Sequence, residues 1–527
     1  MKAQLNRLGN GGDPARYGVL DSRGRNPVAA VSTHSAVKLI IAAFVGLLFL
    51  VFLISNNATF SWSDQGGDPH PKLTLNQPIE PDSRRPITLV CPNQPARTES
   101  APPVIQCRGS PPPPPYAARL RPSAACPEYF RWIHEDLRPW RETGITRDMV
   151  LRSRPFATIH MVVVGGRVYV QEYFGRGLSR NVFTLWGILQ LIQRYPGRVP
   201  DFELVFNCMD MPSVKAAEYN ASTGPPPPLF HYCKDDKTRD ILFPDWSFWG
   251  WPETNIRPWV PLMKEMKEGN AEVKWTERVP YAYWKGTPFM GGTRLDLVKC
   301  NVTKERDWNA RIYAQDWNKE SKQGYHRSNL ARQCHHRYRI YVEGLAWSVS
   351  QKYIMACNSP TLFVDTKFIE FFQRGLMPSR HYWPVAVNNK CRAIKFAVDW
   401  GNAHPEEAQA MGKASSDFFQ EQVTMDHVYD YMLHSITEYA KLLRYQPSVP
   451  EGFTEVCMES LACHASEKTK EYMLESMERW TSDTEPCALD PPFTSDELQK
   501  LLETRENNVK QVETWEQQAG EEQGNKN

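Results

Sequence analysis

Asp210 is the first residue of this sequence that could carry out chemistry. It follows an apolar run at 202–208, which is typical of a buried strand, and it precedes Met211 and Pro212. In open α/β sheets, ligands bind beyond the carboxyl ends of the strands. A carboxylate at that place could take a proton from a hydroxyl group. An aspartate at a strand end is as often a helix cap or a turn residue, so its position alone leaves both roles open.

Two further segments could hold a phosphate group. In the first, Gly286 and Thr287 are followed by a Gly-Gly pair and then by Arg294. Small residues let the backbone approach a phosphate closely, and an arginine can bind it with two parallel hydrogen bonds. The second is the stretch 343–350, which could form the turn and the helix start beneath a bound ligand. A plain loop and a core helix with a buried Trp347 are the structural alternatives.

A base and an anion-binding segment together meet the needs of inverting glycosyl transfer. The base deprotonates the acceptor hydroxyl, and a positive group stabilises the departing nucleotide diphosphate. Many transferases hold a metal for this purpose with an Asp-x-Asp motif, but no two aspartates in this sequence are separated by a single residue. We therefore expect no metal and no cofactor: helix N-termini and an arginine or lysine would bind the diphosphate.

The elements that must position these residues indicate an α/β fold. Residues 158–164 and 167–173 are β-rich and flank a Gly-Gly turn, which predicts a hairpin. The apolar spacing after Ser179 predicts a helix that ends before Pro196. Further expected elements are a strand at 281–284, a helix-like start at 337–350, a strand within 353–364 and amphipathic helices at 404–420 and 425–445. Strands that alternate with helices favour parallel sheets.

The bulk composition limits the class of protein. The chain has 527 residues and a net charge of +2, and its basic residues do not form a patch interleaved with aromatics, which excludes a nucleic-acid partner. The twelve cysteines include no CxxC pair, so disulfides are expected rather than a zinc site. Asn57, Asn220 and Asn301 each begin an N-x-S/T glycosylation triplet.

An uncharged apolar run at 39–54 predicts a transmembrane helix over 36–54. Basic residues dominate the segment before it, and acidic residues follow it, so the positive-inside rule places the N-terminus in the cytosol. This is a type II, single-pass topology with a lumenal catalytic part. Dense prolines over 55–125 predict a semi-rigid stem. A buried core helix and a cleaved signal peptide are the alternatives to the anchor.

Five stretches of the globular part form a recognisable ordered set. They lie at 126–137, 243–251, 283–286, 341–348 and 381–384. This set resembles the CAP10-like, Rumi-type protein O-glucosyltransferase family, and within it the plant branch. The resemblance covers roughly 126–445. It implies a GT-B architecture, in which two Rossmann-like lobes face a cleft, with a UDP-sugar donor, inversion at the anomeric carbon and no required metal.

The resemblance assigns roles residue by residue. The family's base lies in a strand-end Asp-x-Pro motif, which is Asp210 here. The donor loop falls on Gly286, Thr287 and Arg294, with one extra residue before the arginine. The second nucleotide segment falls on six consecutive residues, Leu345, Ala346, Trp347, Ser348, Val349 and Ser350. Animal members end that segment with an arginine, so its phosphate contact would be rebuilt here, for example by Lys352.

The resemblance also implies a disulfide between Cys334 and Cys357. A second family disulfide near the acceptor site has no counterpart, because 171–181 contains no cysteine. The tryptophan cluster at 243–251 would lie beside the cleft, and we expect Trp249 or Trp251 to be a platform for the sugar or the acceptor. The implied donor sugars are glucose and xylose, and the acceptor is a glycoprotein or a polysaccharide.

We therefore expect a Golgi membrane enzyme, with the endoplasmic reticulum as the alternative compartment. A non-catalytic membrane scaffold, or a partner of another Golgi transferase, is the competing interpretation, because Ser350 replaces the family arginine. The expected parts are a cytosolic tail at 1–35, the transmembrane helix at 36–54, the stem at 55–125, an N-terminal Rossmann-like lobe at 126–275, a donor-binding lobe with closing helices at 276–445 and a C-terminal extension with a charged tail at 446–527.

Overall fold

The computed structural model describes residues 84–91, 107, 121, 123–173, 179–220 and 222–524. Glu80–Asn527 forms one compact unit. The expected transmembrane helix, Asn57 and most of the expected stem lie outside the described residues. Within the described part, none of the helices combines the length and the apolar character needed to cross a bilayer.

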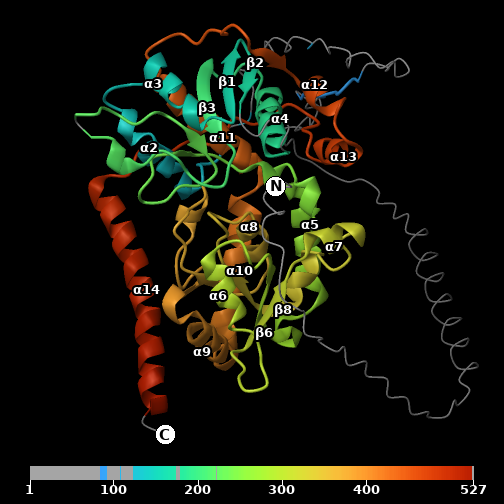
Figure 1. The fold of residues 1–527 in the computed structure, drawn as a ribbon, viewed down its shortest axis with the longest axis vertical. Helices are drawn as coiled ribbons and strands as arrows, with labels where there is room; N and C mark the ends of the chain where they lie inside the picture. Colours follow the sequence, from blue (N-terminus) through green and yellow to red (C-terminus); the bar gives the residue numbers. More distant parts are fainter. Residues whose placement is uncertain are drawn as a thin grey trace, which may run out of the picture. The chain divides into compact units, whose positions relative to one another are not determined.

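The described residues contain two sheets, each with its own helices, which we call the first lobe and the second lobe (Figure 1). The first sheet has, in spatial order, β11 (Thr454–Val456), β2 (Arg167–Glu172), β1 (Ile159–Val164), β3 (Phe202–Asn207), β4 (Phe230–His231) and β5 (Ile241–Leu242). The second sheet has β10 (Trp383–Val385), β9 (Thr361–Val364), β8 (His336–Tyr341), β6 (Val279–Gly286) and β7 (Ala310–Ala314).

The first sheet is mixed, so the expectation of parallel sheets is wrong for this lobe. β1 is antiparallel to both β2 and β3, whereas β3, β4 and β5 are parallel. The cause is the predicted hairpin, which is confirmed: Gly165 and Gly166 have φ angles of 57° and 73° and allow the tight turn between β1 and β2. The second sheet is entirely parallel, as expected.

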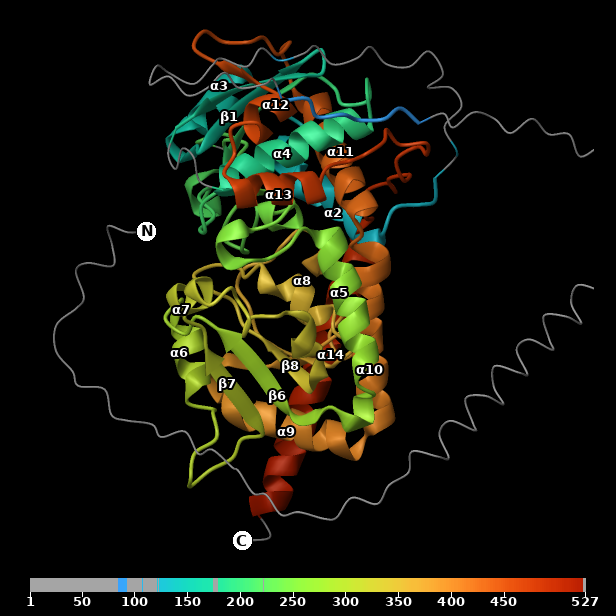
Figure 2. The same ribbon diagram turned by 90° about the vertical axis from the view of Figure 1, so that its right-hand side faces the viewer.

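Each lobe has its own set of helices. Those of the first lobe are α2 (Trp132–Asp136), α3 (Arg147–Arg152), α4 (Ser179–Arg194), α11 (Met425–Leu442), α12 (Met458–Ala462) and α13 (Glu467–Glu475). Those of the second lobe are α5 (Trp259–Glu272), α6 (Gly292–Val298), α7 (Trp317–Lys322), α8 (Ser350–Met355), α9 (Lys390–Ala403) and α10 (Pro405–Asp417). Figure 2 shows α4 and α13 side by side in the upper part and α5 and α10 below them.

The sequence-based prediction of a helix-like start at 337–350 is wrong. Its first part is strand β8, and α8 begins only at Ser350. Short apolar runs cannot be assigned to helix or strand by pattern alone. Here the pairing of β8 with both β6 and β9 decides the conformation.

The segment after 446 is built into the fold rather than appended to it. It supplies β11 to the first sheet, and its cysteines join distant parts of the chain in the disulfides Cys91–Cys463, Cys107–Cys457 and Cys126–Cys487. Its last helix, α14 (Ser495–Gly524), runs beside the second lobe in Figure 1 and contacts β10. One face of α14 is turned toward the protein, with Val512 buried and Trp515 partly buried.

Candidate active site

Asp210 lies in the turn that follows β3, at the carboxyl end of the strand. The buried carboxylate of Asp240 accepts hydrogen bonds from the backbone N–H groups of Ser213 (2.9 Å) and Val214 (3.0 Å), which fixes the chain just after Asp210. Burial raises the pKa of Asp240 to about 6. The Asp210 side chain itself is 36% exposed. It is therefore an accessible carboxylate on a supported turn.

Arg180 forms an ion pair with Asp210. Its Nη1 donates to Oδ1 of Asp210 at 2.9 Å and to the carbonyl of Cys208 at 3.3 Å. The guanidinium also lies 4.5 Å from the centroid of the Trp246 ring. Among the hydrogen bonds of the described residues, none reaches Oδ2 of Asp210, so that oxygen is available for another donor.

Sequence reasoning missed Arg180. It is the second residue of α4, where it reads as an ordinary surface residue near a helix start. The available signal was topological. Because β2 and β3 are both antiparallel to β1, they run parallel to each other, and α4 connects them. Such a crossover helix begins at the same sheet edge where both strands end.

Aromatic contacts join the Asp210 region to the second candidate segment. The Trp246 ring lies 5.2 Å from Tyr232 and 6.0 Å from Trp347, measured between ring centroids. Trp347 belongs to the 345–350 stretch that precedes and begins α8. The structure thus brings Asp210 and this stretch into one continuous cluster through Arg180 and Trp246.

Arg294 is a buried cation without a carboxylate partner among the described residues. Its side chain is on α6, and the residue is 8% exposed. Nε donates to the carbonyl of Glu343 at 2.9 Å, and Nη1 donates to the carbonyl of Thr287 at 3.3 Å. Nη2 donates to Oγ of Ser348 at 3.0 Å. Burial lowers the pKa of Arg294. A buried charge without a counter-ion is unfavourable unless an anion binds to it.

Arg294 therefore holds the two candidate donor segments together. Gly291 makes their approach possible: it has a φ of 100°, and a Cβ at this position would lie 2.6 Å from the carbonyl oxygen of Gly344. Only glycine accepts this combination of conformation and contact. The Gly286 and Thr287 loop and the 345–350 stretch are thus neighbours, as the resemblance implies.

The 345–350 stretch presents hydroxyl groups next to Arg294. Ser348 Oγ lies 2.8 Å from Ser350 Oγ, and the Ser348 N–H donates to the Tyr341 hydroxyl at 3.3 Å. Ala346, Trp347 and Val349 are buried, whereas Leu345 is exposed. The stretch therefore combines an apolar anchor with a small polar face.

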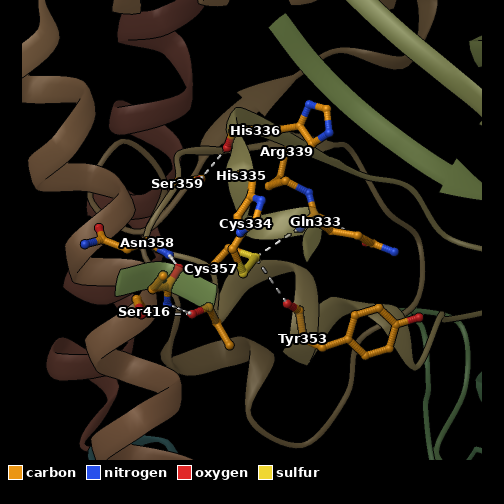
Figure 3. Close-up of a disulfide and its surroundings, with 12 residues drawn as sticks. Gln333, Cys334, His335, His336, Arg339, Tyr353, Cys357, Asn358, Ser359 and Ser416 are labelled. Atoms are coloured by element: carbon orange, nitrogen blue, oxygen red, sulfur yellow. Dashed lines mark hydrogen bonds between the residues drawn. A yellow bond between two sulfur atoms is a disulfide. The ribbon is translucent and has the colours of Figure 1, made fainter. Parts of the chain in front are cut away.

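A disulfide fixes the far end of α8 (Figure 3). Cys334 and Cys357 are bonded, as the resemblance implies, and both are fully buried. Arg339 Nη1 donates to Cys357 Sγ at 3.0 Å, and Arg339 Nη2 donates to Gln333 Oε1. Since α8 begins at Ser350 and ends at Met355, this bond holds the helix whose first residue is the last of the candidate donor residues.

The comparison with known proteins identifies the family. The model of glycosyl transferase family 90 matches residues 121–516, which include both sheets and the whole candidate site. This chain belongs to glycosyl transferase family 90. It is therefore an enzyme that transfers a sugar.

Three animal proteins are similar to this family 90 member. The chain is 24% identical to O-glucosyltransferase rumi of Drosophila melanogaster over 341 residues, which cover 61% of this chain and 78% of the relative. It is 27% identical to human Protein O-glucosyltransferase 1 over 355 residues, which cover 63% and 85% of the two chains. The mouse protein of the same name is 28% identical over 355 residues, with the same coverage.

Of the two tryptophans expected as a platform in this family 90 enzyme, Trp249 or Trp251, the structure contradicts Trp249. Trp249 is 1% exposed, and its Nε1 donates to the Tyr429 hydroxyl at 3.0 Å. The indole packs on Gly187, where a Cβ would lie 2.5 Å from the Trp249 ring. A ring enclosed in this way cannot stack on a sugar. Trp251 is only partly buried and lies 5.2 Å from Trp246 between ring centroids, so it remains a candidate.

Lys352 does not fit the expected role of replacing the arginine that the resemblance implies at the end of this stretch. Its Nζ donates to Asp245 Oδ2 at 2.9 Å and to the carbonyl of Val349 at 3.3 Å. Neither side chain of the Lys352–Asp245 pair is exposed. The ammonium group is thus enclosed inside the protein and paired with a carboxylate, out of reach of a ligand.

Among the described residues of this family 90 chain, one cluster of side chains has the composition of a metal site: Cys126, His434 and Cys487. The two cysteines form a disulfide, so they offer no thiolates. This cluster is structural and does not fit a metal.

Two of the three glycosylation asparagines lie among the described residues, and they differ in accessibility. Asn220 is exposed in a turn. Asn301 is partly buried, and its side-chain amide both donates to and accepts from the backbone of Ile312, at 3.1 and 3.0 Å. A glycan on Asn301 would disturb this pairing, so Asn220 is the better acceptor of the two.

Proposed function

We propose that this enzyme transfers glucose or xylose from a UDP-sugar to a hydroxyl group of an acceptor, with inversion at the anomeric carbon. The human and mouse relatives are named Protein O-glucosyltransferase 1, which supports a protein hydroxyl as the acceptor, with a polysaccharide as the alternative. One observation carries the proposal: contacts lead from the accessible carboxylate of Asp210, through Arg180 and Trp246, to Trp347, and the next residue, Ser348, accepts from the buried cation Arg294.

Asp210 is the proposed general base. Its Oδ2 accepts the proton of the acceptor hydroxyl while the oxygen attacks the anomeric carbon of the donor. The bond between that carbon and the UDP oxygen breaks on the opposite face, which inverts the configuration. The proton ends on Asp210, and the bonding electrons leave with UDP. A positioned base of this kind typically contributes about 10²- to 10⁴-fold in rate.

Arg294 and the 345–350 stretch are the proposed donor site. The Arg294 guanidinium supplies the positive charge. Its one N–H without a partner among the described residues, on Nη1, and the hydroxyls of Ser348 and Ser350 offer hydrogen-bond donors to the leaving diphosphate. The backbone carbonyl of Thr287 accepts from the same guanidinium, which places the Gly286-Thr287 loop beside it. The charge that other transferases obtain from a metal would be supplied here by the arginine. This proposal predicts that a chelator such as EDTA leaves the activity unchanged.

Arg180 is the proposed positioning residue of the base. Its ion pair with Oδ1 orients the Asp210 carboxylate, and its stacking on Trp246 fixes the guanidinium in turn. Trp251, at the edge of the same cluster, is the proposed contact for the acceptor or the sugar.

The enzyme is proposed to work in the lumen of the Golgi, anchored by residues 36–54 in a type II orientation. The five disulfides of the structure support an oxidising compartment. The endoplasmic reticulum remains the alternative.

The replacement Asp210→Asn tests the proposed function. UDP-glucose and UDP-xylose turnover should fall by about 10²- to 10⁴-fold, because an amide cannot accept the proton. UDP affinity, measured by calorimetry, should stay within twofold of the wild type, since Asp210 lies outside the donor segments. The matched control is Asp236→Asn in an exposed turn, which should retain full activity.

Full activity of Asp210→Asn would refute the assignment of Asp210 as the general base. A wild type that neither binds UDP nor turns over a UDP-sugar would favour the scaffold interpretation.

A further inference from the structure

Glu343 is a buried acidic residue beside Arg294 whose side chain has no role in the reaction proposed above. It follows the end of β8 by two residues and is 7% exposed. Its backbone carbonyl accepts from Nε of Arg294 at 2.9 Å, and the carbonyl of Val342 accepts from Nη2 at 3.4 Å. A Cβ on the next residue, Gly344, would lie 3.5 Å from the same Nη2. The backbone of Glu343 is therefore part of the proposed donor site.

The carboxylate of Glu343 is held by one of its two oxygens. Oε2 accepts from the backbone N–H groups of Lys367 at 2.9 Å and of Phe368 at 3.4 Å. Both of these residues follow β9, the strand that pairs with β8. Among the hydrogen bonds between described residues, none reaches Oε1 of Glu343. The side chain is thus fixed in position and keeps one acceptor oxygen for another donor.

The surroundings of this carboxylate favour a donor that is itself uncharged. Burial raises the pKa of Glu343, so its negative charge is incompletely compensated by its neighbours. The Arg294 guanidinium donates to the backbone carbonyl of Glu343, which leaves the positive charge of the arginine for the diphosphate. An ammonium group or a metal ion on Oε1 would lie close to that guanidinium and be repelled by it. A hydroxyl group donates a hydrogen bond without adding a charge.

The topology of the second sheet places Glu343 where a ligand binds. β9, β8 and β6 are neighbouring parallel strands, so their carboxyl ends meet at one edge. Thr287 follows β6, Glu343 follows β8, and Lys367 follows β9. Ligands of open parallel sheets bind beyond this edge. In a UDP-sugar, hydroxyls of the ribose and of the transferred sugar flank the diphosphate on its two sides. A diphosphate at Arg294 therefore brings hydroxyl groups to the neighbourhood of Glu343.

We propose that Oε1 of Glu343 accepts a hydrogen bond from a hydroxyl group of the bound UDP-sugar, either on the ribose or on the transferred sugar. This inference rests on the proposed function, because it requires the diphosphate to lie at Arg294. A donor that lacks the hydroxyl leaves the buried carboxylate without its partner, so the enzyme rejects it. Glu343 thus determines which donor is bound and takes no part in the exchange of bonds.

Calorimetry on the purified full-length protein tests this proposal. The ligands are UDP with its 2′-deoxy and 3′-deoxy analogues, and UDP-glucose and UDP-xylose with the analogues that lack one hydroxyl of the sugar. The wild type should bind one analogue about tenfold more weakly than its parent, the usual effect of losing a hydrogen bond to a charged group. Glu343→Gln should bind that analogue and its parent within about threefold of each other. The glutamine keeps an oxygen for the Lys367 and Phe368 N–H groups, so the loop after β9 is preserved.

The matched control is Asp365→Asn, which removes an exposed carboxylate just after β9 and should discriminate between analogue and parent as the wild type does. The analogue that is rejected tells whether the hydroxyl is on the ribose or on the sugar. The inference is refuted if the wild type binds every analogue as tightly as its parent, a result that needs no variant. It is also refuted if Glu343→Gln keeps the full discrimination, or if Asp365→Asn loses it equally. In these cases UDP binding and the role of Asp210 stand, whereas a wild type that does not bind UDP overturns the proposed function and this inference together.

Discussion

Lys352 and Asp245 form an ion pair of 2.9 Å between the two lobes, and neither side chain is exposed to solvent. Asp245 precedes the short 3-10 helix Trp246–Phe248 in the first lobe and caps it through the Ser247 N–H. Lys352 lies on α8 of the second lobe. The pair therefore joins the tryptophan cluster beside Asp210 to the helix that begins in the candidate donor segment.

Removal of the lysine should destabilise the protein strongly. Lys352→Met leaves Asp245 as a buried charge without its partner, which typically costs about 3–5 kcal/mol. The free energy of unfolding, measured with guanidinium chloride, should fall by this amount. The control is Lys395→Met, whose exposed pair with Asp399 is worth at most about 1 kcal/mol. Equal decreases in the free energy of unfolding of both variants would show that the buried Lys352–Asp245 pair contributes no more to stability than the exposed pair does.

Arg180 should matter for catalysis and little for donor binding. Arg180→Met removes the group that orients Asp210, and a misplaced base reduces kcat by about 10- to 100-fold. Arg180→Lys should recover part of the rate, because an ammonium group can still pair with the carboxylate. Steady-state kinetics should show an unchanged KM for the UDP-sugar.

A chemical rescue separates positioning from a general structural effect. Added guanidinium ion, at concentrations too low to unfold the protein, should restore part of the activity of Arg180→Ala. It should not rescue the double variant Arg180→Ala/Asp210→Asn. Rescue of neither variant, together with a higher KM for the donor, would place Arg180 in the donor site instead.

Arg294 should determine the affinity for UDP. A hydrogen bond to a charged group contributes about 1.5–3 kcal/mol, so Arg294→Met should weaken UDP binding about tenfold or more. Calorimetry measures this directly, and the increase in Tm that UDP gives the wild type should disappear. Arg306→Met, at an exposed position before β7, is the control and should bind UDP normally. Unchanged affinity in Arg294→Met would remove this residue from the donor site.

The parts of the fold that were predicted correctly depend on local signals. The Gly165-Gly166 turn determines the β1–β2 hairpin through two positive φ angles, and these need no distant partner. The buried run of β3 and the helix from Ser179 likewise follow from nearby spacing. The start of β8 was misassigned because its neighbours β6 and β9, which lie far away in the sequence, decide its conformation.

The site was predicted in part for the same reason. Arg294 and the 345–350 stretch could be paired only through the family resemblance, since 54 residues separate Arg294 from Ser348. The burial of Trp249 depends on Gly187 and Tyr429, neither of which is near it in the sequence. The contact between Arg180 and Asp210 spans 30 residues, and no local pattern marks it.

The attachment of α14 to the second lobe should depend on pH through Glu516. Burial and the neighbouring Glu513 raise the pKa of Glu516 to about 7, from an ordinary value of 4.5. Beside it on α14, Trp515 stacks on Trp400 with 5.9 Å between ring centroids. A raised pKa means that the folded protein binds the proton more tightly than the unfolded chain does. This contribution to the free energy of unfolding is therefore fully present below pH 4.5 and is lost as the pH rises toward 7.

The variant Glu516→Gln should lack this decline in stability. The Tm of the variant should therefore exceed that of the wild type by an amount that grows between pH 5 and pH 7.5. Glu521→Gln, exposed near the end of the same helix, should follow the wild type at every pH. Parallel Tm curves for the wild type and Glu516→Gln would show that this carboxyl group titrates alike in the folded and unfolded protein.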